Sequence, residues 1–426
     1  MGRFAMKLSL KNIGKIRDET TIQFDGITVL AGENGSGKST ISKALYCMFH
    51  GLYDIENKVY KDRKLEIANV ILNNLDRKGN MRRSIGLSAD LVEELIKSYS
   101  NDQDVNRLAD ILKNADLQLM EEVKAEDLAI QVEQVLQIPD VHLKERMLIR
   151  VLQSKFDGNI ANVNFPQEES FIKLDIKGKE LSVFISSDGM LSIQHNLELS
   201  RDAVYIDDSF VPERLFGRHG WYSRYGHEAV DGFRTGASGR EHDDATAAGE
   251  ILKEEKNSKI FAFMDSIGIG NLRKEENGRW LYSSRNLEKP IGIENISSGT
   301  KAFLTLKYLL EKQIIDNKSV LILDEPEVNL HPRWQERYAE IIVLLQKSFE
   351  LTLLVSTHSS DFVSFLEYYT KKYKSAQNCH YYLMNDKPDE TVSLVEDVTT
   401  QIDRIYRELS LPYLRVVEQM DGDDAF

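Results

Sequence analysis

The sequence lacks several features that define common classes of protein. Only two cysteines occur, Cys47 and Cys379, so a disulfide framework is excluded and a metal site built from thiolates is not predicted. No run of about 18 apolar residues is present, and the first residues do not form the apolar core of a secretory signal. We therefore expect a cytoplasmic protein with no membrane partner.

Positive charge is also scarce. The chain has 54 lysines and arginines against 68 aspartates and glutamates, which gives a formal net charge of −14 and a pI near 5.3. Such a surface repels phosphate backbones on average, so any contact with nucleic acid requires a local patch of positive charge.

Sustained heptad repeats are also missing from the sequence, which argues against a long coiled coil. With 426 residues, 42% of them hydrophobic, the chain is long enough for large buried cores.

A phosphate-binding loop is present near the N-terminus. Residues 31–40 read AGENGSGKST and fit the pattern G-x-x-x-x-G-K-[ST], between a strand-like run over 27–30 and a helical run that begins near Ile41. Glycines let backbone amides turn toward phosphates, and the following helix presents its positive end. The predicted nucleotide-binding residues are Asn34, Gly35, Ser36, Gly37, Lys38, Ser39 and Thr40. Lys38 is expected on the β- and γ-phosphates of ATP, and the Ser39 hydroxyl on Mg²⁺.

Two further strand-like runs end in polar residues with catalytic potential. The run 319–323 leads into Asp324 and Glu325. Asp324 is suited to hold Mg²⁺ through water, and Glu325 to take a proton from an attacking water. The run 351–356 leads into Thr357 and His358, which predicts that His358 lies beside the γ-phosphate.

A serine-rich segment precedes the helical run 302–311. Residues 294–301 read ENISSGTK. Ser297 supplies a hydroxyl and Gly299 a backbone without a side chain, at a helix N-terminus where a γ-phosphate can dock. An ordinary helix-capping serine is the alternative interpretation of Ser297.

Along the sequence, these elements resemble those of the ATP-binding-cassette (ABC) class of ATPases and occur in the same order as in that class. The order is Walker A, signature, Walker B, D-loop and switch histidine. The resemblance implies an α/β P-loop ATPase head with a mixed central sheet flanked by helices and an antiparallel β lobe. The signature departs from the pattern L-S-G-G-Q at Ile296, Ser298 and Thr300. In that class the signature serine serves the nucleotide of the opposite subunit. Because this sequence has one Walker A and one signature, the resemblance implies a composite-site dimer or a higher even oligomer.

The N-terminal strands indicate which ATPases within this class the sequence resembles. Strand-like runs over 7–12 and 20–24 flank Gly14 in an L-K-N-I-G-x-I pattern, which resembles chromosome-maintenance, RecF-like and overcoming-lysogenization-defect ATPases. The short helical insertion, together with too few residues after His358 for a Toprim nuclease domain, is similar to ATPase subunits of bacterial antiphage systems. The resemblance is particularly to the PtuA ATPase subunit of Septu and, next, to AriA of PARIS. The resemblance implies slow ATP hydrolysis and a separate effector nuclease as partner, of the HNH type in Septu.

The domain organisation is predicted from changes in composition and periodicity. We expect the first part of the ATPase head over 1–53, a helical insertion over 54–156, a β-rich part over 157–212, a flexible Gly/Arg-rich loop over 213–250 and the rest of the head over 251–426. The helical runs in the insertion include 89–99, 105–119 and 141–152. Gln194 ends a strand-like run and is the candidate for the glutamine loop. The loop 213–250 is interpreted either as solvated or as a contact for a partner or for nucleic acid.

Three functions stay open at this point. The first is a regulatory ATPase of a defence complex, the second is a RecF-like ATPase that binds DNA in repair or recombination, and the third is a nucleotide-held scaffold with little turnover. The acidic total charge favours a protein partner over DNA.

Overall fold

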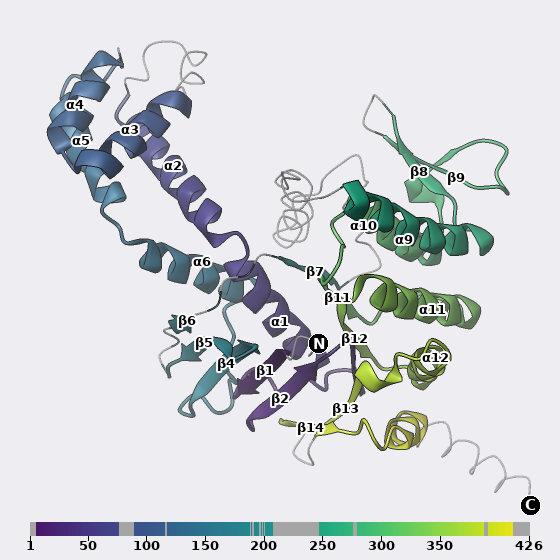
Figure 1. Cartoon of the computed structure of the whole chain (residues 1–426). Helices are drawn as coiled ribbons and strands as arrows, with labels where there is room; N and C mark the ends of the chain where they lie inside the picture. Colours follow the sequence, from purple (N-terminus) through teal and green to yellow (C-terminus); the bar gives the residue numbers. More distant parts are fainter. Residues whose placement is uncertain are drawn as a thin grey trace, which may run out of the picture. The chain divides into compact units, whose positions relative to one another are not determined.

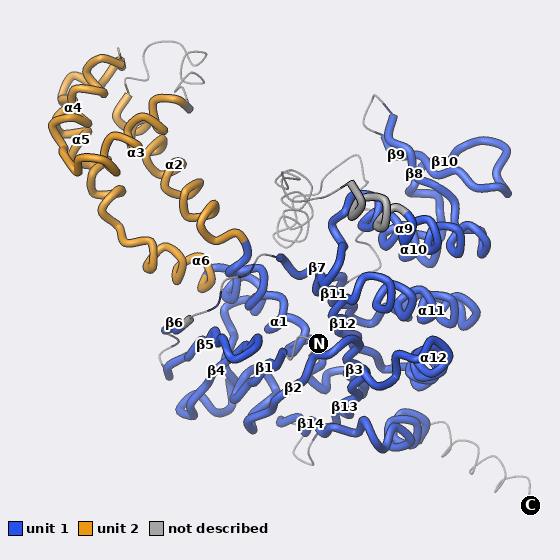
Figure 2. Tube along the Cα trace, viewed as in Figure 1, with its two compact units in different colours: residues 1–53, 150–426 blue, residues 54–149 orange. Residues whose placement is uncertain are grey.

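The chain divides into two compact units in this computed structural model (Figure 2). The first unit comprises residues 1–53 and 150–426, and the second comprises 54–149. The structure describes residues 6–75, 89–115, 117–187, 189, 191–195, 197, 199, 201–207, 247–275, 279–386 and 391–411. Of the Gly/Arg-rich loop expected over 213–250, only 247–250 fall within these residues, and they begin a helix.

A six-stranded sheet forms the centre of the first unit, with the order β14-β13-β3-β12-β11-β7 (Figure 1). Its strands are β3 (Ile27–Gly32), β7 (Ala203–Ile206), β11 (Val320–Asp324), β12 (Thr352–Thr357), β13 (Cys379–Asp386) and β14 (Ser393–Asp397). All are parallel to their neighbours except β14, which is antiparallel to β13. Every residue of β3 is buried, as expected for a parallel strand covered on both faces.

Helices pack against this sheet and complete its core. They are α1 (Lys38–Leu52), α9 (Ala247–Ser266), α10 (Ser298–Glu311), α11 (Pro332–Phe349) and α12 (Ser360–Lys372), with a further helix over 403–411. Phe303 of α10 is fully buried and meets the rings of Trp334 and Tyr338 of α11 edge-on, at centroid distances of 5.3 and 5.1 Å. These aromatic contacts join α10 to α11.

The first unit also contains two antiparallel sheets. The larger has the order β2-β1-β4-β5-β6, built from β1 (Met6–Lys11), β2 (Thr20–Phe24), β4 (Ser170–Ile176), β5 (Lys179–Ile185) and β6 (Leu191–His195). Along β1, the buried residues Met6, Leu8 and Leu10 alternate with more exposed ones, so one face of this strand faces the core. The smaller sheet contains β8 (Asn271–Lys274), β9 (Trp280–Ser283) and β10 (Ile291–Gly292).

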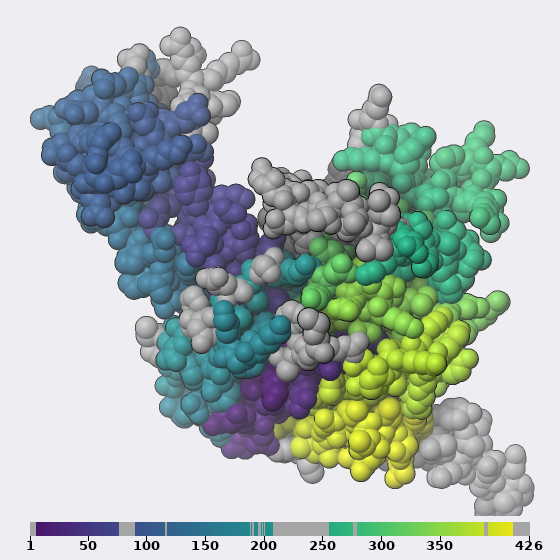
Figure 3. Space-filling view, in the orientation of Figure 1, coloured from purple at the N-terminus to yellow at the C-terminus, as the bar shows by residue number. Residues whose placement is uncertain are grey.

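The predicted fold class is confirmed, with a mixed central sheet, flanking helices and an antiparallel β lobe. Pairing of β3 with β13 brings the N-terminal part of the chain beside its C-terminal part, which Figure 3 shows as purple next to yellow. None of the helices in the described part of the chain combines the length and apolar character needed to cross a membrane.

The second unit is helical. It contains α2 (Ile55–Asn73), α3 (Ala89–Asp102), α4 (Val105–Asn114), α5 (Ala125–Leu136) and the beginning of α6 (Asp140–Lys155). Its core includes Ile67, Leu95, Leu108 and Val132, which are all fully buried. The helical run expected over 105–119 ends early, at Asn114, because the chain turns there and Leu119 pairs with Leu75 in an isolated bridge.

Candidate nucleotide-binding site

The parallel strands bring distant parts of the sequence to one edge of the central sheet. In the register of the sheet, Asp324 of β11 pairs with Ser356 of β12, and Thr357 of β12 pairs with Ala31 of β3. The Walker A loop, Asp324 with Glu325, and His358 therefore follow the carboxyl ends of three adjacent strands. This edge is where ligands bind in open α/β sheets.

The Walker A loop has the backbone conformation that its glycines permit. Gly35 and Gly37 have φ values of 80° and 88°, in the left-handed region that side chains rarely adopt. Gly37 precedes the first residue of α1, so the amide groups at the N-terminus of this helix follow the loop directly. The Ser36 side chain is buried, whereas Asn34 is exposed.

Lys38 is almost fully buried at the start of α1, with 3% of its surface exposed. Its Nζ donates hydrogen bonds to the carbonyl oxygens of Gly32 and Glu33, at 2.9 and 2.7 Å, and lies 4.0 Å from Glu325 Oε1. Burial lowers the pKa of this lysine, and the nearby carboxylates, Glu325 foremost, oppose that shift. The ammonium group thus has several acceptors that phosphate oxygens can replace.

The two carboxylate oxygens of Asp324 differ in their hydrogen bonding. The Tyr205 hydroxyl donates to Oδ2 at 2.9 Å, while Oδ1 is buried and has no hydrogen-bond partner among the described residues. Burial raises the pKa of Asp324, and hydroxyl groups, first that of Ser39, favour its charged form. A buried, unpaired carboxylate oxygen next to a serine hydroxyl fits a hard cation such as Mg²⁺.

The protein would supply only part of the ligand set of such a cation. Within the described residues, no group of three histidine, cysteine, aspartate or glutamate side chains is arranged to hold a metal ion. Mg²⁺ typically keeps several waters and takes one or two carboxylates together with substrate phosphates. Ser39 and Asp324 match that pattern.

Glu325 lies between the lysine and the histidine. Its Oε1 is 4.0 Å from Lys38 Nζ and 3.5 Å from His358 Nδ1, and its side chain is about one-third exposed, at 34%. The residue has a φ of 50°, which is uncommon outside glycine, and its backbone N–H donates to the carbonyl of Ser356 at 2.8 Å. This bond to β12 fixes the turn that directs the Glu325 carboxylate into the pocket.

Glu327 is a buried carboxylate to which the sequence alone gave no role. It is 3% exposed and accepts hydrogen bonds from Thr357 Oγ1 at 2.5 Å and from the backbone N–H of His358 at 3.2 Å. His358 Nδ1 is 3.7 Å from the same oxygen. Burial raises the pKa of Glu327. Its only local signal was its place three residues after Asp324, because the groups it binds belong to another strand.

The signature residues occupy the N-terminus of α10. Ser297 is the N-cap, and its Oγ accepts a hydrogen bond from the backbone N–H of Thr300 at 3.2 Å. A Cβ added at Gly299 would lie 3.2 Å from Leu330 Cδ2, so glycine permits close packing against the loop after Walker B. Neither Ser297 nor Gly299 lines the pocket formed by the Walker A loop of the same chain.

That pocket has a volume of about 640 Å³, within the usual range for ligand sites. The Walker A loop and the turn after β11 contribute Gly35, Gly37, Lys38, Ser39, Thr40 and Glu325 to its lining. Other regions of the sequence contribute Gly14, Lys15, Asn159, Ala161, Asn162, Val163, Asn164 and Thr391. Gln194 is not among the lining residues, because it is an exposed residue of β6 opposite Ser182 in the antiparallel sheet.

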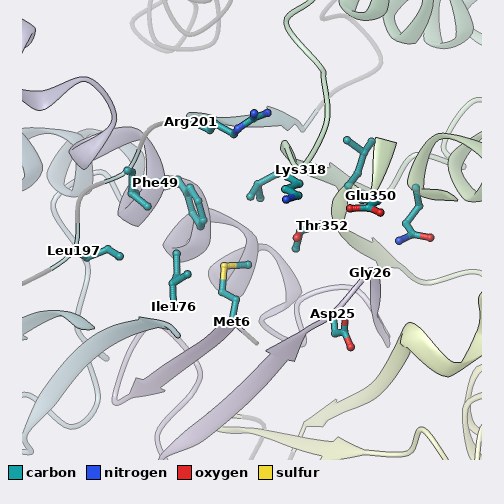
Figure 4. A pocket seen from close by; sticks show the side chains of 14 residues that line it. Met6, Asp25, Gly26, Phe49, Ile176, Leu197, Arg201, Lys318, Glu350 and Thr352 are labelled. Atoms are coloured by element: carbon teal, nitrogen blue, oxygen red, sulfur yellow. The ribbon is translucent and has the colours of Figure 1, made fainter. Parts of the chain in front are cut away.

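A smaller cavity of about 220 Å³ lies at the opposite edge of the central sheet (Figure 4). It is lined by residues that precede strands, such as Asp25 before β3, Lys318 before β11 and Glu350 before β12, together with apolar side chains including Phe49. None of the site residues predicted from the sequence lines it.

Two protein families match parts of the chain. One is described as "AAA domain" and matches residues 7–182, and the other is described as "AAA domain, putative AbiEii toxin, Type IV TA system" and matches residues 223–364. The first match includes the Walker A loop and the second includes the signature, Walker B and His358. Each match covers less than half of the chain, and together they make the chain similar to AAA-type ATPase domains on both sides of the site.

Solved structures of SMC heads are also similar over nearly the whole chain. The SMC head bound to the C-winged helix domain of ScpA has 13% identity and a TM-score of 0.46, covering 94% of this chain and 99% of the other. The SMC head domain from Thermotoga maritima has 12% identity and a TM-score of 0.41, covering 93% and 99%. The head with an extended coiled coil bound to the C-terminal domain of ScpA, from Pyrococcus furiosus, has 14% identity and a TM-score of 0.42, covering 98% and 99%.

Proposed function

We propose that this chain binds ATP with Mg²⁺ and hydrolyses it slowly. The observation that carries the proposal is the convergence of Lys38, Asp324, Glu325 and His358 at the carboxyl ends of three adjacent strands. The backbone amides of the Walker A loop and Lys38 bind the phosphates. When bound, Mg²⁺ neutralises phosphate charge, held by the Ser39 hydroxyl and, through water, by Asp324.

Glu325 is the group suited to take the proton from the attacking water. Its carboxylate is partly exposed to the pocket, and it has two cationic or polar neighbours, Lys38 and His358. His358 orients Glu325 or the γ-phosphate from the end of β12, and Glu327 fixes the backbone from which His358 projects. Positioning and electrostatic stabilisation account for most of catalysis in phosphoryl transfer, and this arrangement is the part of the hydrolytic site that one chain supplies.

The active form is a composite-site dimer or a higher even oligomer. Ser297 and Gly299 stand at an exposed helix N-terminus but do not line the pocket of their own chain. A helix N-terminus that presents a hydroxyl and a glycine favours the binding of an anion. We therefore assign these two residues to the γ-phosphate of the partner subunit's nucleotide.

The biological role that we propose is regulation of a separate effector nuclease in a bacterial antiphage complex, most similar to PtuA of Septu and next to AriA of PARIS. ATP-dependent closure of the oligomer would hold or license the effector, an HNH nuclease in the Septu case. The similarity of residues 223–364 to the family described as "AAA domain, putative AbiEii toxin, Type IV TA system" supports a defence role. The net charge of −14 supports a protein partner over DNA.

The experiment is to purify the tagged chain with the proteins encoded beside it, with ATP and without, and to identify what co-elutes by mass spectrometry. A nuclease that co-elutes with wild-type chain and protects cells from phage only when Lys38 is intact supports the defence role. If no protein co-elutes and the chain instead binds duplex DNA at physiological salt, the RecF-like repair function replaces it.

A further inference from the structure

The pocket at the Walker A loop is also lined by a segment from another region of the sequence. Residues 159–164 supply five lining side chains, namely Asn159, Ala161, Asn162, Val163 and Asn164. They come a few residues before β4, which begins at Ser170, and far from the Walker A loop in sequence. A triphosphate bound at the loop leaves its nucleoside to occupy the rest of the pocket.

The segment is held firmly by backbone hydrogen bonds. Gly14 N donates to the carbonyl of Ile160 at 3.1 Å, and Asn162 N donates to the carbonyl of Asn12 at 3.0 Å. Ile13 and Ala161 form an isolated β-bridge between these two bonds. The segment is thus paired with the loop after β1 and presents its side chains from a fixed backbone.

Asn162 stabilises the shape of the segment from within. It is 2% exposed, and its Oδ1 accepts a hydrogen bond from the backbone N–H of Asn164 at 2.9 Å. This hydrogen bond closes a turn from Asn162 to Asn164. The turn fixes the backbone of Val163, the residue between them. The exposed side chains of Asn159 and Asn164 each offer a hydrogen-bond donor and an acceptor at the pocket.

Val163 is 72% exposed, the highest value among the large apolar side chains of the described residues that face solvent. An apolar side chain exposed on a fixed backbone contributes nothing to the core. Burial of its apolar surface becomes favourable only when a ligand covers the side chain. The flat face of a nucleobase is an apolar surface of suitable size at this place.

We propose that residues 159–164 bind the nucleoside of the triphosphate, with Val163 against the base and the amides of Asn159 and Asn164 on ribose hydroxyls or the edge of the base. The proposal rests on the nucleotide-binding function given above and adds the part of the site that distinguishes a nucleotide from a bare chain of phosphates. Phosphate binding by Lys38 and base binding by Val163 are then separable.

The test compares two ligands, ATP and inorganic tripolyphosphate, by calorimetry on the full chain. Val163→Ser should weaken ATP binding about tenfold, because covering a valine is worth on the order of a tenfold change in affinity, and should leave tripolyphosphate binding unchanged. Val163→Ile, which keeps the apolar contact, should bind ATP like the wild type. Leu65→Ser is the matched control, since Leu65 of α2 is also exposed, at 62%, and should leave both affinities unchanged.

The outcomes distinguish the nucleoside-binding role of residues 159–164 from the nucleotide-binding function of the whole site. Wild-type ATP affinity in Val163→Ser, or an equal loss for ATP and tripolyphosphate, would overturn the assignment of the nucleoside wall. Failure of the wild-type chain to bind either ligand would instead overturn the nucleotide-binding function itself. A melting temperature close to that of the wild type should accompany the Val163 variants, because the side chain has no core contacts to lose.

Discussion

The backbone N–H of His358 donates a hydrogen bond to the carboxylate of Glu327 across 3.2 Å, although the two residues are 31 positions apart in the sequence. The hydroxyl of Thr357 donates to the same oxygen. Glu327 thereby joins the loop after Walker B to the end of β12. Because Glu325 and His358 are carried by these two segments, Glu327 fixes the distance of 3.5 Å between their side chains.

Glu327→Ala should lower kcat for ATP hydrolysis by about tenfold to a hundredfold, since small misplacement of a catalytic group has effects of this order. The KM for ATP should change little, because the Walker A loop is untouched. Glu327→Gln keeps an oxygen that can accept from His358 and should retain most of the activity. Steady-state phosphate release at several ATP concentrations separates the two parameters.

Glu340 is the matched control for this prediction. It is also buried, at 2% exposed, and accepts hydrogen bonds from Tyr373 at 2.7 Å and Lys372 at 3.0 Å, but it belongs to α11 and does not line the pocket. Glu340→Ala should lower the melting temperature, because it removes the acceptor of the Tyr373 hydroxyl and of Lys372, and should leave kcat unchanged below that temperature. Equal losses of kcat in both alanine variants would show that Glu327 acts only through stability.

The contrast between Glu327 and Lys38 explains how far the sequence could predict this site. Lys38 belongs to a motif whose residues are contiguous, and the strand and helix around it follow from local periodicity. Glu327 depends on the pairing of β11 with β12, which the local sequence does not determine. The same holds for 159–164, whose place in the pocket comes from backbone bonds to Asn12 and Gly14. A helical run from residue 105 could be predicted because its apolar spacing is local, as α4 shows, where Leu108, Ala109 and Leu112 are buried.

Lys38→Ala should abolish most of the affinity for ATP. The lysine is the one cation of the Walker A loop, and the remaining loop residues from 34 to 40 carry no positive charge. Lys259→Ala is a suitable control, because Lys259 is 75% exposed on α9 and pairs with Glu255 one turn away. Calorimetric ATP affinity should fall in the first variant and stay constant in the second. Unchanged affinity in Lys38→Ala would contradict the Walker A assignment.

Glu325→Gln should uncouple binding from turnover. The substitution keeps the shape of the side chain and removes the proton acceptor, so ATP should bind while hydrolysis falls by about 10²-fold or more. The variant should also accumulate the closed oligomer in ATP, because the nucleotide that bridges the subunits is not consumed. Size-exclusion chromatography with light scattering measures the second effect. Wild-type phosphate release from this variant would place the catalytic base elsewhere.

The assignment of Ser297 to the partner's nucleotide makes a prediction about mixed oligomers. Ser297→Arg places a bulky side chain where the γ-phosphate of the neighbour should dock, and chains with this variant alone should be inactive. Lys38→Ala chains alone should be inactive as well. In a dimer of one chain of each kind, one composite site combines two defects and the other combines the intact Walker A of one chain with the intact signature of the other.

Mixing equal amounts of the two variants should therefore restore about one quarter of wild-type ATPase activity, if half of the dimers are mixed and each has one of two sites intact. Loss of the Ser297 cap would destabilise α10 by about 1 kcal/mol. Recovery of activity in the mixture nevertheless shows that the Ser297→Arg chain is folded, because that chain supplies the intact Walker A loop. A mixture of Lys38→Ala with the double variant Lys38→Ala, Ser297→Arg should recover nothing, since it contains no intact Walker A. Native mass spectrometry must establish that subunits exchange. If exchange occurs and the first mixture stays inactive, Ser297 does not act across the interface, and the composite-site dimer is contradicted.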